Sequence, residues 1–481
     1  MIAPLAMSDP LSDLNAALQS ENLLAASKAA RAVLADSPAL GGRWGEIAGA
    51  ALTAGDELTA LAAAEKLAEA APDHADSWLW IASVQAALGR HEAVVSLLQR
   101  RARRFQSSGA LQRRLGRSLL ELGQPVQAEQ AFRAALGLDP SDALAWEGLS
   151  RCKRFARGDD DLAAMEQLRL SGPSEADADK RGVLSYAIAK AYDDLDEFET
   201  AGRRVSEGAA FYRDAAPFDL PAHEGGVDHI LSTYDSRFAA TNDEAGVLDA
   251  RPVMILAPPR AGADWLSQVL SADAAAAALM RGNACFWAAS SPLGDHRPDD
   301  LLAAFKAGGP NILAEVGRTY LDRVTERAGR DARRVIDPSS LLEIAGGAAG
   351  LCLPAATFVR ITRAPRDAAW SVYRHRFARG RHWSYHPDDI ARILSAHNRL
   401  CERWAELFSE RFMTVAYEDL AAAPQETVAE IARFAGVDPE AAGAEAWLTA
   451  DRLKAEPVGV HQRAGSRFEA VEAALQRAGL V

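Results

Sequence analysis

The sequence predicts a multidomain protein in which an all-α helical-repeat domain precedes an α/β domain built on a parallel sheet. Three observations lead to this fold class. The chain has 481 residues, which is too long for one ordinary core. Residues 1–215 are rich in strong helix formers, and residues 8–155 among them repeat with a period of 34 residues. From residue 251 on, short apolar runs alternate with helical patterns.

The repeat is carried by prolines, tryptophans and glycines that recur at intervals of 34 or twice 34 residues. Three tryptophans each follow a proline by six residues, and three glycines are 34 residues apart. The positions are Pro38, Pro72 and Pro140, Trp44, Trp78 and Trp146, and Gly55, Gly89 and Gly123. In the clearest unit, the small residues Gly116 and Ala128 are expected to let two helices cross closely, with Gly123 in the turn between them.

This pattern resembles the tetratricopeptide repeat (TPR) over residues 8–155. The resemblance implies a superhelix whose concave groove holds a protein or peptide client. A spacer or dimerisation module is the alternative. The basic run at residues 99–104, with Arg113, Arg114 and Arg117, is either a site for an acidic ligand or a solvated helix face.

We place the repeat domain at residues 1–215, a helical connector at residues 216–250 and the α/β domain at residues 251–481. The predicted strands of the α/β domain are four short apolar runs, at residues 253–256, 334–336, 357–362 and 412–415. Three of these runs lead into predicted helices. Such alternation implies a parallel sheet with helices on both faces.

Composition excludes several classes of protein. The net charge of −13 argues against a protein that coats nucleic acid or binds an anionic membrane. The four cysteines and the histidines show no metal-binding spacing and no disulfide framework. No segment reaches the ~18 apolar residues of a membrane helix, and the N-terminus lacks the pattern of a signal peptide. We therefore expect a cytoplasmic protein without nucleic-acid partner, membrane insertion or metal, of unassigned oligomeric state.

The loop after the first predicted strand has the features of an anion-binding site. It reads Pro258-Pro259-Arg260-Ala261-Gly262 and leads into a helix expected from Asp264. Backbone N–H groups at a helix N-terminus bind phosphates, and Arg260 adds a forked cationic donor. The Walker motif GxxxxGK[ST] is absent, which argues against a nucleoside triphosphatase or a nucleotide kinase.

A second candidate site follows the third predicted strand. Arg363 leaves this strand at the carboxyl edge of the sheet, where open α/β sheets bind ligands, and Ser371 lies one turn into the next helix. Together they are expected to bind a second phosphate at some distance from the first. Asp367 is expected to cap the N-terminus of this helix.

Both segments resemble the PAPS-dependent sulfotransferases, where PAPS is 3′-phosphoadenosine 5′-phosphosulfate. The motif RxPRDxxxS at residues 363–371 and the strand–PR–x–G loop carry the resemblance, and residues 417–420 and 434–437 extend it. The domain order is similar to that of bacterial proteins that join TPRs to a sulfotransferase domain and are relatives of the tyrosylprotein sulfotransferases. The resemblance implies a P-loop-like fold, PAPS as co-substrate and a hydroxyl acceptor.

The resemblance also implies which residues bind the nucleotide: Arg260, Gly262, Trp265, Arg363, Ser371, Arg463 and Gly465. The first two match the loop around the 5′-phosphosulfate, and Arg363 and Ser371 match the pair that binds the 3′-phosphate. Trp265 matches an adenine-stacking position, with an ordinary core position as the alternative. Gly465, with Arg463 beside it, is similar to the C-terminal glycine loop that closes over the nucleotide.

The half of the site that would transfer the sulfuryl group departs from the family pattern. The family loop PRSGTT is PRAGAD here, which removes three hydroxyls and places Asp264 beside the expected phosphosulfate. Each lost charge-assisted hydrogen bond is worth about 1.5–3 kcal/mol. The Gly-Glu that supplies the general base is replaced by Gly282-Asn283, and DKxPxN is reduced to DPSSL at residues 337–341.

Arg260 and Asp337 are the candidate catalytic residues, and Glu315 and His461 are further candidate bases. The sequence thus favours a PAPS-dependent sulfotransferase with reduced activity, acting on a hydroxyl of a protein held by the TPR groove. The alternative is a catalytically degenerate sulfotransferase-fold scaffold whose TPR domain binds a protein client.

Overall fold

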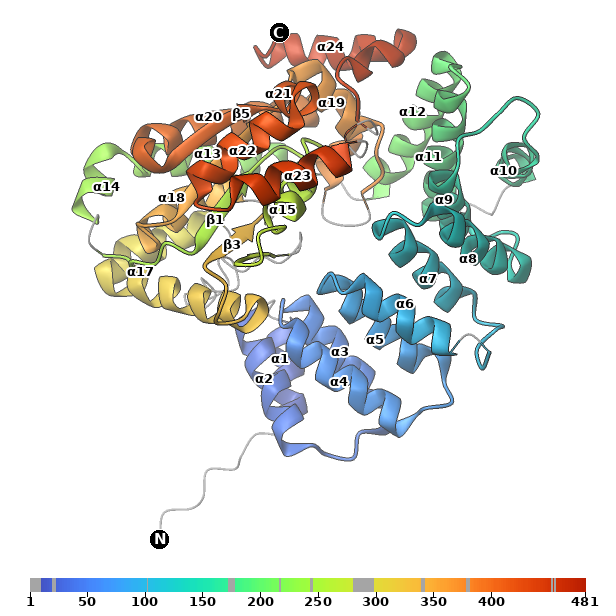
Figure 1. Ribbon diagram of the computed structural model, residues 1–481, viewed down its shortest axis with the longest axis horizontal. Coiled ribbons are helices and arrows are strands. Elements are labelled where there is room, and N and C mark those ends of the chain that lie inside the picture. Colours follow the sequence, from blue (N-terminus) through green and yellow to red (C-terminus); the bar gives the residue numbers. More distant parts are fainter. Residues whose placement is uncertain are drawn as a thin grey trace. The chain divides into compact units, whose positions relative to one another are not determined.

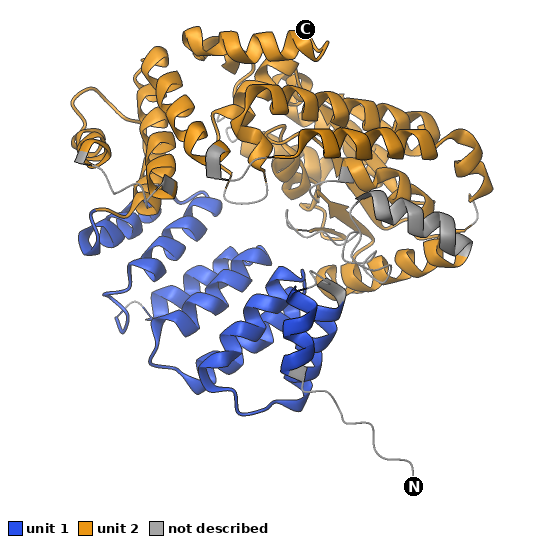
Figure 2. Cartoon of the chain, turned by 180° about the vertical axis from the view of Figure 1, so that it is seen from behind, with its two compact units in different colours: residues 1–140, 284–301 blue, residues 141–283, 302–481 orange. Residues whose placement is uncertain are grey.

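Contacts along the chain divide it into two compact units, residues 1–140 with 284–301 and residues 141–283 with 302–481 (Figure 2). The domain boundaries predicted at residues 215 and 250 stay predictions. The computed structural model describes residues 10–19, 23–101, 103–171, 178–215, 218–242, 245–279, 298–338, 342–377, 381–450, 453 and 456–481.

The described residues of the first 140 form α-helices that pair as hairpins along the chain (Figure 1). Their bounds are α1 Pro10–Gln19, α2 Leu23–Asp36, α3 Trp44–Thr53, α4 Glu57–Ala70, α5 Ala75–Ala87, α6 His91–Arg101, α7 Gly109–Glu121 and α8 Pro125–Leu138. Gly55, Gly89 and Gly123 stand in the turns of three successive hairpins, with φ of 69°, 75° and 69°. Because glycine adopts this left-handed conformation without steric cost, the turn geometry explains the 34-residue glycine period.

The predicted close crossing in the hairpin of α7 and α8 is confirmed. A Cβ atom added to Gly116 would lie 2.8 Å from Cζ of Phe132, and Ala128 is fully buried. The two helices therefore approach so closely that their contact requires small residues at these positions.

Among the described residues of the second unit, six α-helices precede the sheet: α9 Ala143–Cys152, α10 Asp160–Ser171, α11 Ala178–Asp194, α12 Phe198–Ala215, α13 Leu220–Thr233 and α14 Ser236–Thr241. The longest two, α11 and α12, pack along each other. Gly182 makes this packing possible, since a Cβ atom there would lie 2.5 Å from the ring of Tyr212.

Five described strands form one parallel sheet in the order β2-β3-β1-β4-β5. Their bounds are β1 Pro252–Leu256, β2 Ala276–Ala278, β3 Arg334–Asp337, β4 Thr357–Thr362 and β5 Phe412–Ala416. The four predicted strands are confirmed. The edge strand β2 was not predicted, because three alanines carry little strand preference.

Helices cover both faces of the sheet, as predicted for strand–helix alternation (Figure 1). The helices after β1 are α15 Ala263–Leu270, α17 Pro298–Ala328, α18 Leu342–Cys352, α19 Pro365–Tyr373, α20 Pro387–Leu407, α21 Tyr417–Ala422, α22 Pro424–Ala435, α23 Pro439–Thr449 and α24 Phe468–Arg477. Val253 and Ile255 on one face of β1 share a core with α15, α22 and α23. A second core joins α19, α20 and α24 to α11 and α12.

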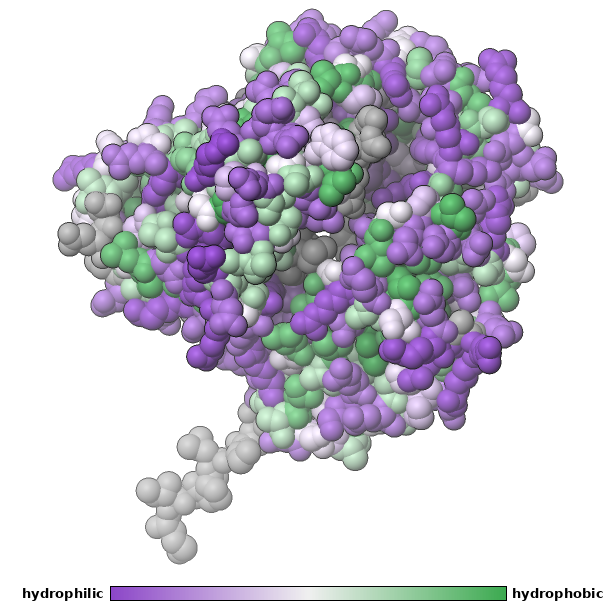
Figure 3. Space-filling view, viewed as in Figure 1, coloured by the Kyte–Doolittle hydropathy of each residue, from purple (hydrophilic) through white to green (hydrophobic). Residues whose placement is uncertain are grey.

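The surface agrees with the composition. Hydrophilic residues predominate on the face seen in Figure 3, with apolar residues scattered among them. Within the described part of the chain, no helix combines the length and the apolarity that crossing a membrane requires.

Candidate functional site

The loop after β1 holds an arginine in an unusual backbone conformation. Arg260 has φ of 67°, in the left-handed region that costs a non-glycine residue about 1–3 kcal/mol. The carbonyl oxygen of Arg260 accepts a 2.5 Å hydrogen bond from Nη1 of Arg363. The loop after β1 and the end of β4 are therefore in direct contact, since β1 and β4 are neighbours in the sheet.

The carboxylate of Glu456 joins the residues that the sequence assigned to two separate phosphate sites. Its Oε1 accepts a 3.1 Å hydrogen bond from Nε of Arg260. Its Oε2 accepts a 2.6 Å hydrogen bond from the hydroxyl of Ser371 and lies 3.3 Å from Nη2 of Arg374 and 3.6 Å from Nη1 of Arg363. We call the four donors Arg260, Arg363, Ser371 and Arg374 the anion cradle.

The anion cradle changes one expectation. Arg363 and Ser371 were expected to act at some distance from Arg260, but all three meet at one carboxylate. The reason is the order of the strands. The carboxyl ends of β1 and β4 are paired side by side, so the segments that follow them converge.

The cradle carries more positive than negative charge. Three guanidinium groups face Glu456, and the nearby carboxylate of Asp193 lies 3.6 Å from Nη1 of Arg374. Burial of Glu456 opposes its ionisation, but Arg260, Arg374 and the Ser371 hydrogen bond outweigh burial and lower the pKa of Glu456 to about 2. The carboxylate is therefore ionised at neutral pH.

Residues 456–463, here called the strap, are fastened over the cradle by backbone contacts. The hydroxyl of Tyr417 donates a 2.8 Å hydrogen bond to the carbonyl of Glu456. Nη2 of Arg363 donates to the carbonyls of Glu456 and Pro457 at 3.4 and 3.5 Å. The guanidinium carbon of Arg363 lies 4.5 Å from the centre of the Tyr417 ring. Arg363, whose side chain is fully buried, thus links the strap to the loop after β1.

Asp367 fastens the other end of the strap. Its carboxylate accepts hydrogen bonds from the backbone N–H groups of Gly459 and His461, at 2.6 and 3.1 Å, and lies 2.5 Å from Nδ1 of His461. The prediction that Asp367 caps its own helix is wrong. The N-cap residue of α19 is Ala364, without a side-chain cap, because the strap takes both oxygens of Asp367.

Models of two protein families match parts of the chain. A model of the sulfotransferase family matches residues 252–441, and a tetratricopeptide-repeat model matches residues 109–152. Residues 252–441 form a sulfotransferase-family domain. The relation to tyrosylprotein sulfotransferases stays a prediction. The donors of the anion cradle all lie within the matched range, whereas Glu456 lies beyond it.

One curated relative of the chain is an uncharacterized protein of Aquifex aeolicus (strain VF5). The two are 20% identical over 352 residues, and the match covers 70% of this chain and 45% of the relative. The chain thus spans less than half the length of this relative.

The solved structures that are similar to parts of the chain include two sulfotransferases. The sulfotransferase domain of the Synechococcus PCC 7002 olefin synthase is 18% identical with a TM-score of 0.31, covering 49% of this chain and 89% of that chain. A sulfotransferase from Mycobacterium tuberculosis H37Rv is 17% identical with a TM-score of 0.29, covering 67% and 99%.

Trp265 and Gly262, two other predicted nucleotide-binding residues of the sulfotransferase-family domain, make contacts of a different kind. Trp265 is 7% exposed, belongs to the core with α22 and α23, and donates a 3.0 Å hydrogen bond to Thr449. Trp265 therefore occupies an ordinary core position, which the sequence analysis gave as the alternative to stacking on adenine. Gly262 has φ of 84°, and a Cβ atom there would lie 3.3 Å from the Tyr417 ring. Asp264 is exposed on α15.

The predicted C-terminal glycine loop packs on α12. Gly465 has φ of 59°, and the N–H of the next residue, Ser466, donates a 2.6 Å hydrogen bond to Glu199. Nη1 of Arg463 lies 3.9 Å from Asp193. The residue of the C-terminal segment that contacts the cradle is Glu456, which precedes Arg463 and Gly465 in the sequence.

The candidate bases occupy different environments. Asp337 is fully buried at the carboxyl end of β3 and accepts a 2.9 Å hydrogen bond from the hydroxyl of Tyr320. Glu315 is exposed on α17, and His461 belongs to the strap.

The predicted departures at residues 282–283 and 339–341 lie outside the described residues. Among the described residues, no cluster of three or more His, Cys, Asp or Glu side chains could hold a metal ion.

Sequence reasoning missed two residues of this site. Arg374 follows Ser371 by three residues at the end of α19, a spacing that places both on one helix face, so this arginine could have been found. Glu456 has no such signal. It is 85 residues from Ser371 and 196 residues from Arg260, and only the tertiary fold brings them together.

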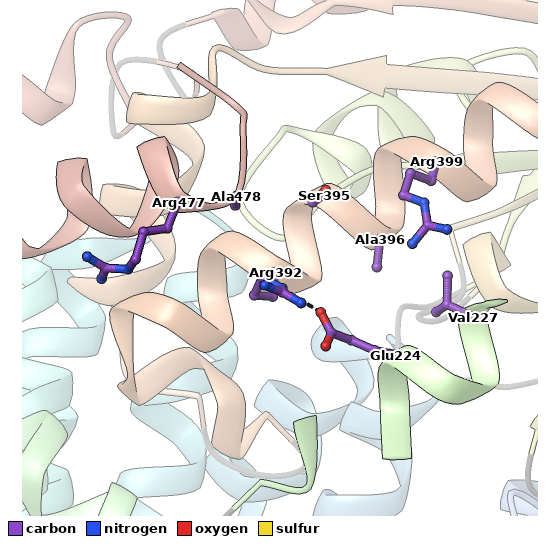
Figure 4. A pocket seen from close by; sticks show the side chains of 8 residues that line it. All are labelled: Glu224, Val227, Arg392, Ser395, Ala396, Arg399, Arg477 and Ala478. Atoms are coloured by element: carbon purple, nitrogen blue, oxygen red, sulfur yellow. Dashed lines mark hydrogen bonds and ion pairs between the residues drawn. The ribbon is translucent and has the colours of Figure 1, made fainter. Parts of the chain in front are cut away.

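A separate pocket of about 160 Å³ lies among α13, α20 and α24 (Figure 4). It is lined by Glu224, Val227, Arg392, Ser395, Ala396, Arg399, Arg477 and Ala478. Its three arginines pair with Glu224, Asp228 and Asp388 at 2.5–2.7 Å, and Figure 4 shows the first of these pairs. Because each positive charge faces a carboxylate, this pocket is a poorer anion site than the cradle.

Proposed function

We propose that the sulfotransferase-family domain transfers a sulfuryl group from PAPS to a hydroxyl acceptor, and that the anion cradle binds a phosphate of the nucleotide. The observation that carries the proposal is the convergence of Arg260, Arg363 and Ser371, with Arg374, on a single anion. The first three were chosen from the sequence. They meet where the family segment places the carboxyl ends of neighbouring parallel strands.

A phosphate monoester suits the cradle better than a carboxylate does. It has three terminal oxygens and close to two negative charges, and guanidinium groups bind such oxygens in a forked geometry. Nε of Arg363 is buried and has no hydrogen-bond partner within the described part of the chain. A buried donor of this kind favours a further acceptor oxygen.

The proposed reaction is a single in-line displacement at sulfur. The acceptor oxygen attacks the sulfur in line, the bond from sulfur to the 5′-phosphate oxygen breaks, and the hydroxyl proton passes to a base. The product is the sulfated acceptor with 3′-phosphoadenosine 5′-phosphate (PAP) as leaving group. Arg260 would stabilise the charge that develops on the leaving phosphate. Asp337 is the candidate base, since β3 pairs with β1 and ends at the same edge of the sheet.

The helical repeats offer a groove that could bind the protein carrying the acceptor hydroxyl. A groove of about 620 Å³ lies on α4, α5 and α6 of the first unit, and its walls combine apolar side chains such as Trp78 and Leu97 with charged ones such as Glu65 and Arg100. Such a mixed lining suits a peptide. We propose that this groove holds a protein client that carries the hydroxyl, and that the protein acts in the cytoplasm.

The second candidate is a catalytically degenerate scaffold. It is favoured by the sequence PRAGAD, which lacks the three hydroxyls of the family loop. It is also favoured by the burial of Asp337 against Tyr320. In this case the domain would bind PAP or PAPS without turnover, and the TPR groove would still hold a client.

Incubation with sulfur-labelled PAPS and a panel of protein and small hydroxyl acceptors tests transfer, while calorimetry with PAP tests binding. The proposed sulfotransferase gives labelled product and PAP binding, both lost in Arg363→Ala. The matched control is Arg366→Ala, whose arginine lies three residues further along, in α19, and pairs with Glu472 at the surface. PAP binding without labelled product would identify the scaffold. No binding by the wild type would overturn both.

A further inference from the structure

We infer that Glu456 is a built-in competitor for the nucleotide phosphate: its carboxylate occupies the anion cradle and has to leave before a phosphate enters. The inference rests on the proposed function of the cradle as a phosphate site. It adds a residue that lies outside the range matched by the sulfotransferase family and that would set how tightly the nucleotide binds.

The first argument is that the carboxylate uses the same donors as a phosphate would. Arg260 and Ser371 bond to different oxygens of Glu456, and both Arg363 and Arg374 approach Oε2. A phosphate oxygen bonded to Ser371 would stand within about 3 Å of the same hydroxyl, where Oε2 already lies at 2.6 Å. The two anions would also repel each other at this separation. They cannot share the cradle.

The second argument is that the carboxylate can leave while the strap stays in place. Tyr417 holds the backbone of the strap at the carbonyl of Glu456, and Asp367 holds it at Gly459 and His461. None of these bonds involves the Glu456 side chain. The Glu456 side chain is 12% exposed, so rotation about its own bonds can turn the carboxylate toward solvent.

The third argument is the strength of the competition. The cradle lowers the pKa of Glu456 to about 2, from an ordinary value of 4.5. The cradle therefore stabilises the ionised form of this side chain over its protonated form. A ligand has to displace this carboxylate, so its apparent dissociation constant is the intrinsic one divided by the fraction of molecules in which the cradle is free. Removing the carboxylate should raise the affinity for PAP between tenfold and a few hundredfold.

Calorimetry with PAP on four proteins tests the inference. These are the wild type, Glu456→Gln, the double variant Glu456→Gln with Arg363→Ala, and Glu472→Gln. The last is the matched control, because Glu472 pairs with Arg366 of the same helix α19 but outside the cradle. We expect at least ~10-fold tighter PAP binding for Glu456→Gln, no change for Glu472→Gln, and loss of the gain in the double variant.

The outcomes separate this inference from the proposed function. If the wild type binds PAP in an Arg363-dependent way and Glu456→Gln binds equally or more weakly, Glu456 is not a competitor and the proposed function stands. If neither protein binds PAP, the proposed function fails, and the inference fails with it.

A second measurement covers the case that Glu456→Gln folds poorly, since its arginines lose their counter-charge. Glu456→Asp keeps the charge but is one methylene shorter, and it should bind PAP more tightly than the wild type. In low-salt buffer, thermal unfolding of both variants with inorganic sulfate should show a larger rise in melting temperature than the wild type and Glu472→Gln. Equal rises for all four proteins would overturn the inference.

Discussion

The hydroxyl of Ser371 donates a 2.6 Å hydrogen bond to Oε2 of Glu456. The serine belongs to a motif that sequence analysis assigned to phosphate binding, and the glutamate lies 85 residues further along the chain. An anion of the protein itself therefore sits on the donors that we propose for a nucleotide. This relationship makes the site testable with single substitutions.

Arg363→Ala should weaken both folding and PAP binding. The fully buried guanidinium donates to the carbonyls of Arg260, Glu456 and Pro457, and each charged hydrogen bond is worth about 1.5–3 kcal/mol. We expect a loss of about 3–5 kcal/mol in the free energy of unfolding, measured with denaturant, because the variant leaves Glu456 with one cation fewer. Arg366→Ala should cost much less, because its pair with Glu472 lies at the surface and is screened by solvent. Equal losses in the two variants would contradict the central position of Arg363.

Gly262→Ala should destabilise the loop that carries Arg260. Gly262 has φ of 84°, and the added Cβ would lie 3.3 Å from Tyr417, so we expect a loss of about 1–2 kcal/mol in unfolding free energy. Gly225→Ala is the control, since Gly225 lies inside α13 and a Cβ there meets no atom within 4 Å. This control should gain about 0.5–1 kcal/mol. A neutral Gly262→Ala would mean that the left-handed conformation is not required.

Gly116→Ala tests the close helix crossing in the repeat unit. The new methyl group would stand 2.8 Å from Phe132, and overpacking of this kind costs about 1–3 kcal/mol. Gly137→Ala, on the partner helix α8 with no atom within 4 Å, should be neutral or stabilising. Thermal unfolding of both variants checks this. A lower melting temperature for Gly137→Ala than for Gly116→Ala would contradict the packing account.

The pH dependence of stability should report on Glu456. Its pKa lies at about 2 in the folded protein, below the ordinary 4.5, so its stabilising contribution is complete above about pH 5 and is lost as the pH falls through 4.5 toward 2. The difference in unfolding free energy between wild type and Glu456→Gln should therefore be constant from pH 6 to 8 and shrink at pH 4. Denaturant titrations at pH 4, 6 and 8 measure it. A difference that grows on acidification would contradict an ionised carboxylate in the cradle.

The features that could be predicted from the sequence are those fixed by local backbone geometry and residue spacing. Gly55, Gly89 and Gly123 recur every 34 residues because each hairpin turn requires a left-handed residue. Arg363 and Ser371 were found because a strand end and one helical turn fix their spacing. These features depend on a few neighbouring residues, so a sequence pattern identifies them.

Contacts between residues far apart in the sequence explain which features could not be predicted. Asp367 has the position of a helix cap but binds the strap at Gly459 and His461. Glu456 reaches the cradle only because the strap lies against α19 and Tyr417. In both cases a partner about 90 residues away decides the contact, and no local spacing encodes it.

A crystal structure of the protein with PAP tests the central claim most directly. The account predicts a phosphate group within hydrogen-bond distance of Ser371, Arg363 and Arg374, with the carboxylate of Glu456 rotated out of the cradle. A structure at saturating PAP in which Glu456 still bonds to Ser371, and the nucleotide is absent or bound elsewhere, would contradict it.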